Sequence, residues 1–261
     1  MTTIPYPLRF YRASRYSNHK ETNLSKNKRR ELRKVENKDI EVKDKGVLVQ
    51  AKTTGQKKYI IEIMNHVITF CIGPAGSGKT AIPVGVALQS ILGKNPIYEK
   101  LVVMRPVKEA CGEKIGYLPG NVDEKMHPWA EPIVDNMQIW IDSPIIKKLF
   151  YDKKIEIIPL AFARGRSLNK SFIILDESQN CSPDQMLMAL TRIGNDSKMV
   201  INGDLSQTDV SDRVNGLEDA IERMKDMKNV SIVTLDETDI VRNPIIGEII
   251  RRYANRSPVS H

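Results

Sequence analysis

Short apolar runs alternate with amphipathic stretches through the chain from residue 59 onward. Apolar runs bounded by polar residues predict buried strands, and a 3.6-residue periodicity predicts helices. Strands that alternate with helices are typical of parallel sheets, because parallel strands need long crossover connections. The expected strands are Val67–Ile72, Lys100–Met104, Ile155–Pro159, Phe172–Leu175, Met199–Asn202 and Val230–Leu235. The expected helices are Gln56–Asn65, Lys79–Leu92, Pro128–Trp140, Pro183–Arg192, Val214–Met227 and Pro244–Tyr253.

The interval between the second and third strands, residues 105–154, is long for a single connection. Because it contains several glycines and prolines, we expect it to form a surface-exposed excursion from the sheet. Tyr117, Trp129 and Trp140 within it could stack on bases, but core packing or an oligomer contact explains these aromatic residues at least as well.

The composition suits one well-filled globular domain with appendages, since 41% of the 261 residues are hydrophobic and 28% are charged. We expect a basic N-terminal arm at residues 1–50 and an α/β domain at residues 51–261. The longest apolar stretch, Ile60–Ile72, contains polar residues and is shorter than the ~20 residues of a membrane-spanning helix. No membrane association is therefore expected.

The three cysteines, Cys71, Cys111 and Cys181, lie far apart and form no CxxC pair. This pattern argues against a disulfide framework and against a zinc site. The first residues also lack the apolar segment of a secretory signal. Together these features predict a reducing, cytoplasmic location.

The net charge of +8 is concentrated near the start of the chain, where residues 1–58 contain 16 Lys/Arg and 6 Asp/Glu. Tyrosine and phenylalanine side chains are interleaved with these basic residues. Cations and stackable rings suit RNA or single-stranded DNA, because the cations neutralise phosphates and the rings accept bases. A solvated, disordered tail explains the same composition, and both interpretations remain open.

A phosphate-binding loop is the strongest motif in the sequence, because the pattern GxxxxGK[ST] follows an expected strand and precedes an expected helix. The loop comprises Gly73, Pro74, Ala75, Gly76, Ser77, Gly78, Lys79 and Thr80. We expect Lys79 to reach the β- and γ-phosphates of a nucleotide and the Thr80 hydroxyl to bind Mg²⁺. Pro83 lies unusually close to the helix start, where it could bend the helix.

Two carboxylates follow the expected strand Phe172–Leu175 directly. A buried strand that ends in acids delivers them to the carboxyl edge of the sheet, which faces the nucleotide in phosphate-loop enzymes. We expect Asp176 to hold Mg²⁺ and Glu177 to polarise the attacking water. The alternative is that this Asp-Glu pair lies in an exposed loop and takes no part in the chemistry.

A second polar turn follows the expected strand Met199–Asn202 at the same sheet edge. Gln207 could sense the γ-phosphate or orient the water. Asp204 and Asp209 could instead cap the helix beyond.

With these motifs in hand, residues 53–255 resemble the PhoH-like ATPases, a family related to superfamily 1 helicases. The resemblance lies in Gly73–Thr80, Arg105–Gly120, Pro159–Asn180 and Ile201–Asp209. It implies ATPase activity and RNA-linked work, including proposed RNA unwinding. It also matches Gln56 to a glutamine that contacts adenine, Arg164-Gly165-Arg166 to an Arg-Gly-Arg motif, and Arg242 to a C-terminal arginine motif.

These observations favour an ATP- and Mg²⁺-dependent nucleoside triphosphatase with a RecA-like fold, coupled to RNA or single-stranded DNA. A small P-loop kinase and a nucleotide-dependent interaction module are the alternatives. Fast hydrolysis also needs an arginine at the γ-phosphate, often supplied by a neighbouring subunit, for which Arg242, Arg164 and Arg166 are the candidates. We therefore expect a ring-shaped homo-oligomer, most simply a hexamer.

Overall fold

The computed structural model describes residues 49–92, 95–106, 122–207 and 214–241, all within a compact unit of residues 41–261. The expected helix Pro244–Tyr253 and nearly all of the basic arm lie outside the described residues. Val49, at the end of the expected arm, is buried in the core of the domain.

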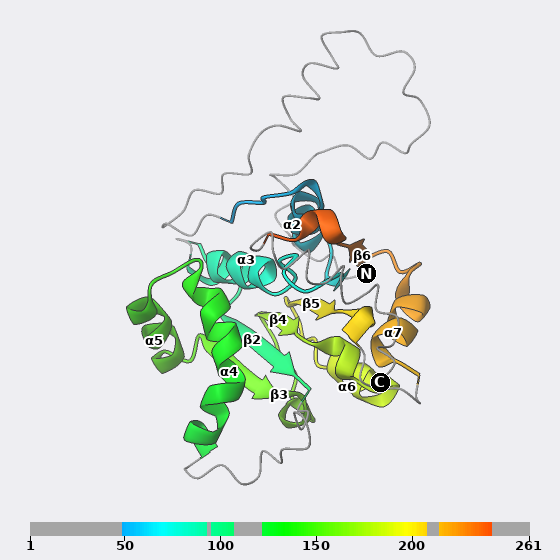
Figure 1. Cartoon of the computed structure of the whole chain (residues 1–261). Coiled ribbons are helices and arrows are strands. Elements are labelled where there is room, and N and C mark those ends of the chain that lie inside the picture. The colour runs from blue at the N-terminus through cyan, green and yellow to red at the C-terminus, as the bar shows by residue number, and fades with distance from the viewer. Residues whose placement is uncertain (1–48, 93–94, 107–121, 208–213, 242–261) are drawn as a thin grey trace, which may run out of the picture. The chain divides into compact units, whose positions relative to one another are not determined.

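The sheet has six strands, and every pairing between neighbouring strands is parallel. The strand order is β3-β2-β4-β5-β1-β6, so β5 separates β1, which precedes the phosphate loop, from β4, which precedes the acids (Figure 1). This arrangement confirms the expected RecA-like α/β fold. The strands are β1 Ile68–Ile72, β2 Lys100–Arg105, β3 Ile155–Pro159, β4 Ser171–Leu175, β5 Lys198–Gly203 and β6 Val230–Thr234.

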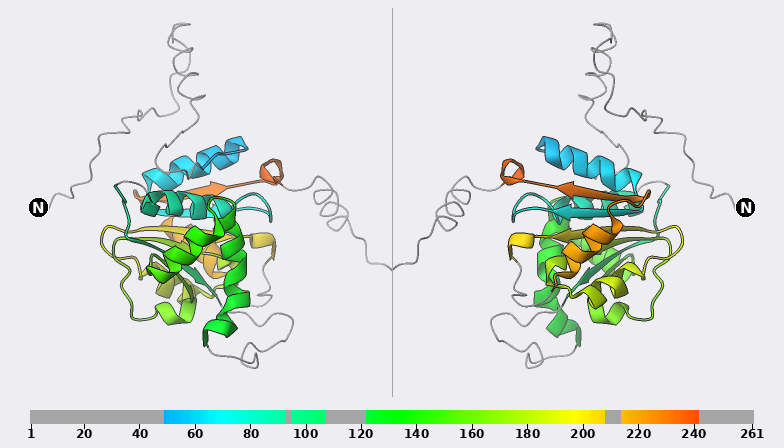
Figure 2. Two further views of the ribbon diagram at one scale, coloured as in Figure 1. Left: turned by 90° about the vertical axis from the view of Figure 1, so that its left-hand side faces the viewer. Right: turned by 90° about the vertical axis from the view of Figure 1, so that its right-hand side faces the viewer.

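Helices cover both faces of the sheet (Figures 1 and 2). Alternate residues of each strand enter different hydrophobic clusters, one packed against α2 to α5 and the other against α6 and α7. The α-helices are α2 Thr54–Asn65, α3 Ala81–Leu92, α4 Val122–Gln138, α5 Ser143–Tyr151, α6 Pro183–Leu190 and α7 Gly216–Met224. The short 3₁₀ turns are η3 Leu160–Ala163, η4 Ser178–Asn180, η5 Leu205–Gln207 and η6 Glu237–Asp239.

The expectation of a surface excursion at residues 105–154 is wrong for its described second half. Helices α4 and α5 pack on the sheet, and Ile133 and Met137 of α4 are fully buried. Trp140 is partly buried in the same core, and its indole N–H donates to the Ala81 carbonyl at 2.9 Å. Core packing therefore explains Trp140, whereas Tyr117 and the side chain of Trp129 are not described.

Helix α3 begins at Ala81, so Pro83 occupies its first turn. Proline is well tolerated in the first turn of a helix, where its fixed φ suits the helical backbone. Within the described residues, no helix is both long and apolar enough to span a bilayer.

Candidate nucleotide-binding site

The loop between β1 and α3 has the backbone conformation that its glycines allow. Gly76 and Gly78 have φ values of 87° and 94°, which residues with a side chain rarely adopt. The Pro74 carbonyl accepts from the Ser77 hydroxyl at 2.9 Å, and the Gly76 carbonyl accepts from the Val241 N–H at 3.1 Å. A loop held through its carbonyl oxygens can direct its N–H groups at an anion.

Lys79 lies at the end of this loop, and its Nζ donates to the Pro74 carbonyl at 2.7 Å. Burial lowers the pKa of Lys79, while the carboxylates of Asp204, Glu177 and Asp176 oppose that shift. A half-buried ammonium is stabilised by an anion beside it, so this position favours a negatively charged ligand.

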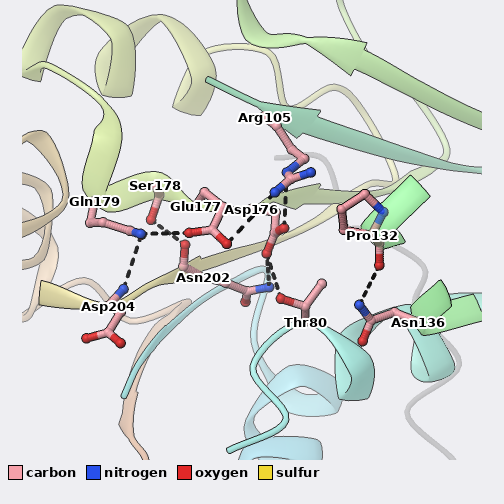
Figure 3. Close-up of polar contacts among 10 residues, drawn as sticks. All are labelled: Thr80, Arg105, Pro132, Asn136, Asp176, Glu177, Ser178, Gln179, Asn202 and Asp204. Carbon is pink, nitrogen blue, oxygen red and sulfur yellow. Dashed lines mark hydrogen bonds and ion pairs between the residues drawn. The ribbon is translucent and has the colours of Figure 1, made fainter. Parts of the chain in front are cut away.

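The phosphate loop meets the carboxyl end of β4 through one hydrogen bond. The Thr80 hydroxyl donates to Oδ1 of Asp176 at 2.7 Å, and Nδ2 of Asn202 lies 3.5 Å from the same oxygen (Figure 3). Asp176 is only 3% exposed, and its N–H donates to the Met104 carbonyl at 2.9 Å. Burial raises the pKa of Asp176, and the nearby Arg105 guanidinium opposes that rise. The carboxylate is therefore fixed against both β2 and the loop.

Glu177 adopts a left-handed backbone conformation with φ of 55°. For a residue other than glycine this conformation costs roughly 1–2 kcal/mol, and such strain is common at functional sites. Oε2 of Glu177 accepts from Nε2 of Gln179 at 2.7 Å, and Oε1 of Gln179 accepts from the Asp204 N–H at 3.2 Å. Gln179 thus connects the acid after β4 to the turn after β5.

Arg105, the last residue of β2, faces both acids (Figure 3). Its Nε lies 3.4 Å from Oδ2 of Asp176, and its Nη2 lies 3.9 Å from Oε1 of Glu177. The guanidinium balances part of the negative charge that this sheet edge accumulates.

The turn after β5 is organised by Asp204. Oδ1 of Asp204 accepts from the N–H and the hydroxyl of Ser206 at 3.1 and 2.6 Å, so Asp204 caps the η5 turn. Oδ2 accepts from Nε2 of Gln207 at 2.8 Å. Gln207 is exposed and lines the cavity. Its expected role at the γ-phosphate or the attacking water stays a prediction. Asp209 lies outside the described residues.

Gln56 lies beside the phosphate loop, but its amide is bound to backbone groups. Nε2 donates to the Ser77 carbonyl at 3.0 Å and faces the Asp239 carbonyl at 3.4 Å, while Oε1 accepts from the Lys52 N–H at 2.9 Å. The side chain is 4% exposed. In this structure Gln56 joins α2, the loop and η6, and the adenine contact implied by the resemblance stays a prediction.

Arg164 and Arg166, two of the arginines expected near the γ-phosphate, do not line the cavity of their own chain. Nη2 of Arg166 pairs with Oε2 of Glu156 at 2.7 Å, and Glu156 lies in the first half of β3. Arg164 is exposed and is absent from the described cavity lining. Arg242 lies outside the described residues.

The cavity at this edge has a volume of about 430 Å³. It is bounded by the phosphate loop, the ends of β2, β4 and β5, and helix α4, which contributes Pro132 and Asn136 to the lining (Figure 3). The oxygen donors Thr80 and Asp176 fit Mg²⁺, which prefers oxygen ligands and often binds one or two carboxylates together with phosphates. Among the described residues, no group of three or more His, Cys, Asp or Glu side chains could hold a metal ion.

Four residues of this site had no role predicted from the sequence: Tyr59, Arg105, Gln179 and Asn202. Arg105 and Gln179 lie in stretches that carry the family resemblance, and Asn202 ends an apolar strand, so their positions were detectable. Tyr59 left no local signal, because its contacts with Lys79 and Asn202 form only when α2 packs beside the loop.

Several known proteins are similar to this chain. The PhoH family, described as PhoH-like protein, matches residues 48–254. A PhoH-like protein of Synechocystis sp. is 42% identical over 218 residues, covering 82% of this chain and 66% of its own. A PhoH-like protein of Bacillus subtilis is 41% identical over 210 residues, covering 80% and 65%. Protein PhoH of Escherichia coli is 33% identical over 209 residues, covering 79% and 58%.

The chain spans between 58% and 66% of the length of these three relatives. Among solved structures, a Pif1 helicase from Candida albicans aligns with 72% of this chain and 40% of its own, with 16% identity and a TM-score of 0.38. That likeness is too low to bear on function. The PhoH family matches most of the chain, and the three relatives are each more than 30% identical to it. The chain therefore belongs to the PhoH-like protein family.

Proposed function

We propose that this protein is an ATP- and Mg²⁺-dependent nucleoside triphosphatase that couples hydrolysis to the binding or remodelling of RNA or single-stranded DNA. The observation that carries the proposal is the 2.7 Å hydrogen bond between Thr80 and Asp176. It joins the phosphate loop to the acidic end of β4, and a hydroxyl beside a carboxylate is the ligand pair that Mg²⁺ uses with a nucleotide.

Five residues of the site have a role in this reaction. Lys79 binds the β- and γ-phosphates, while Thr80 and Asp176 hold Mg²⁺, which when bound neutralises charge on those phosphates. Glu177 orients the attacking water and accepts its proton, and Gln207 assists in placing it.

The reaction balances as a hydrolysis. The water oxygen forms a bond to the γ-phosphorus, and the bond from that phosphorus to the bridging oxygen breaks. ADP leaves with the electron pair of the broken bond, and the proton passes from Glu177 to solvent. Two acids at the site suit water as the acceptor better than a second substrate, which favours hydrolysis over a kinase reaction.

Coupling to nucleic acid rests on the N-terminal charge. The 16 Lys/Arg among residues 1–58 are matched by only 6 Asp/Glu, so the arm attracts a polyanion. A cytoplasmic location, where both ATP and RNA are present, belongs to the same proposal.

Assembly into a ring, most simply a hexamer, completes the proposal. Neither Arg164 nor Arg166 reaches the cavity of its own chain, so a cation supplied across an interface remains an attractive source of catalytic charge. Arg242 is the first candidate for that cation.

Steady-state phosphate release from Mg·ATP, with and without RNA, tests the proposal. Wild-type protein should release phosphate, and RNA should change the rate. Lys79→Ala should abolish turnover and weaken nucleotide binding, because the β- and γ-phosphates lose the loop's cation. Arg223→Ala, on the exposed face of α7, is a matched control for loss of one surface cation and should retain activity.

Two outcomes would contradict the proposal. Normal turnover in Lys79→Ala would remove the phosphate loop from the reaction. Nucleotide binding by the wild-type protein with no phosphate release under any condition would instead favour a nucleotide-dependent regulatory module.

A further inference from the structure

Arg105 lies next to Asp176 and Glu177 and is not part of the phosphate-loop motif. It ends β2, the neighbour of β4, and Met104 accepts the N–H of Asp176 at 2.9 Å. The two strand ends are therefore bonded to each other, which fixes where the Arg105 side chain starts. That side chain is 15% exposed and lines the cavity together with Lys79 and Thr80.

Two other arginines of the described domain differ from Arg105 in what they face. Arg166 pairs with Glu156 at 2.7 Å, and Arg192 donates to the carbonyls of Met188 and Arg166 at 3.0 Å. Both arginines therefore bind groups of the protein away from the cavity. Arg105 instead faces Asp176 and Glu177, which are assigned here to the metal and the water.

Nucleotide binding would reverse the charge balance around this guanidinium. In the structure Arg105 lies 3.4 Å from Oδ2 of Asp176, a carboxylate assigned to Mg²⁺. With Mg·ATP bound, the Arg105 guanidinium would be repelled by the divalent cation beside Asp176 and attracted by the γ-phosphate, and a poorly hydrated cavity would strengthen both interactions. A γ-phosphate oxygen would then be a more favourable partner for Arg105 than either carboxylate.

We propose that Arg105 is a catalytic residue that acts within its own subunit: it pairs with Asp176 and Glu177 before nucleotide binds and contacts the γ-phosphoryl group once Mg·ATP is bound. This inference rests on the proposed nucleoside triphosphatase function. Arg105 gains and loses no proton in the step. It stabilises the charge on the γ-phosphoryl oxygens while the bond to water forms and the bond to the bridging oxygen breaks.

Arg105→Ala and Arg105→Lys test this role, with Arg223→Ala as the surface control. The kcat of Arg105→Ala should fall by roughly 10³-fold or more, the range known for such arginines. Arg105→Lys should be intermediate, because lysine keeps the charge and loses the planar fork. Affinity for Mg·ADP should stay within about threefold of wild type, whereas affinity for Mg·ADP with aluminium fluoride should fall nearly as far as kcat, because that complex mimics the transition state.

A purely structural role predicts a different pattern. If Arg105 only positions the acids, Mg·ADP and the aluminium fluoride complex should weaken by the same factor in both variants, and that result would overturn the inference. Near-normal kcat in Arg105→Ala would overturn it as well. If Arg105→Ala does not fold, the same comparison of the two affinities in Arg105→Lys decides.

Subunit mixing shows in which subunit Arg105 acts. A site needs Lys79 and Arg105 from one chain, so mixing Lys79→Ala with Arg105→Ala protein should restore no activity. Restored activity would contradict action within one subunit. A wild-type protein that releases no phosphate would instead refute the proposed function itself, so the two failures are distinguishable.

Discussion

The hydroxyl of Tyr59 lies 3.3 Å from the carbonyl oxygen of Lys79. In an α-helix that carbonyl would accept from the N–H four residues later, but Pro83 has none. The flanking bonds are present, from Ile82 to Gly78 and from Val84 to Thr80. The tyrosine hydroxyl from α2 can therefore donate to the carbonyl that proline leaves without its helical donor.

Tyr59→Phe should destabilise the protein by about 1–2 kcal/mol, because a buried acceptor on Asn202 and a partly buried one on Lys79 lose their shared donor. The hydroxyl also lies 2.8 Å from Oδ1 of Asn202, and the tyrosine ring is fully buried. Urea denaturation monitored by circular dichroism measures the change in the free energy of unfolding.

Pro83→Ala provides the matching control, because alanine restores an N–H that can donate to the Lys79 carbonyl. The substitution should stabilise Tyr59→Phe protein more than wild-type protein. Equal effects in both backgrounds would show that the hydroxyl and Pro83 are energetically independent.

The sheet was predictable because each inner strand is a run of apolar residues long enough to be recognised alone. Helix α5 was not, because nine residues give too few turns for a periodicity, although Ile146 and Leu149 are buried one turn apart. The sequence also predicted that Thr80 and Asp176 meet, because both were assigned to one Mg²⁺ ion, and the two side chains are hydrogen-bonded. The partners of Gln56 and Arg166 could not be predicted, since they depend on α2 meeting η6 and on Arg166 reaching Glu156 on β3.

Glu177→Gln should slow phosphate release by ~10²-fold or more while ATP and Mg²⁺ binding stay intact, because Asp176 and Thr80 still hold the metal. Glutamine keeps an oxygen that can accept from Nε2 of Gln179, now 2.7 Å from Glu177. Single-turnover rates and nucleotide titrations separate chemistry from binding. A collapse of ATP affinity together with rate would place Glu177 among the metal ligands.

Lys198 should make the free energy of unfolding change with pH in the alkaline range. Its Nζ donates to the carbonyls of Ile63, Met64 and His66 at the end of α2, and burial lowers its pKa to about 8. Between pH 8 and the ordinary lysine value of 10.5, the unfolded chain binds a proton that the folded chain does not. Raising the pH through this window therefore favours the folded state.

Comparison with Lys198→Met isolates this effect, since other titrating groups are shared. The free energy of unfolding of wild type minus that of the variant should rise between pH 8 and 10.5, by at most about 3 kcal/mol. The three carbonyl acceptors favour the ammonium and keep the change below that limit. Urea titrations at several pH values measure it, and a constant difference would contradict the assignment.

Deletion of residues 1–45 should flatten the salt dependence of RNA binding. The segment contains 13 Lys/Arg and 6 Asp/Glu, a net charge of +7, and fewer phosphate contacts release fewer counterions. Basal ATPase activity should survive, because no residue assigned to the site lies there. Unchanged binding at every salt concentration would exclude the arm as a contact.

Arg242 should act across a subunit interface, and mixing experiments can detect this. A subunit with Arg242→Ala keeps its phosphate loop, and a subunit with Lys79→Ala keeps its arginine. Mixed rings contain interfaces that pair an intact loop with an intact arginine, so a mixture of two inactive variants should regain some ATPase activity. Such an arginine is worth ~10³ to 10⁵ in rate, so even partial recovery is measurable.

The described chain ends at Val241, whose N–H donates to the Gly76 carbonyl of its own phosphate loop at 3.1 Å. This contact makes action within the same subunit the competing arrangement, and the mixture distinguishes the two because loss of Lys79 and Arg242 from one shared site cannot be complemented. Dilution gives a second measurement: specific activity should fall as a ring dissociates. A monomer with a concentration-independent specific rate, together with no recovery on mixing, would exclude the ring and leave Arg105 to supply the charge alone.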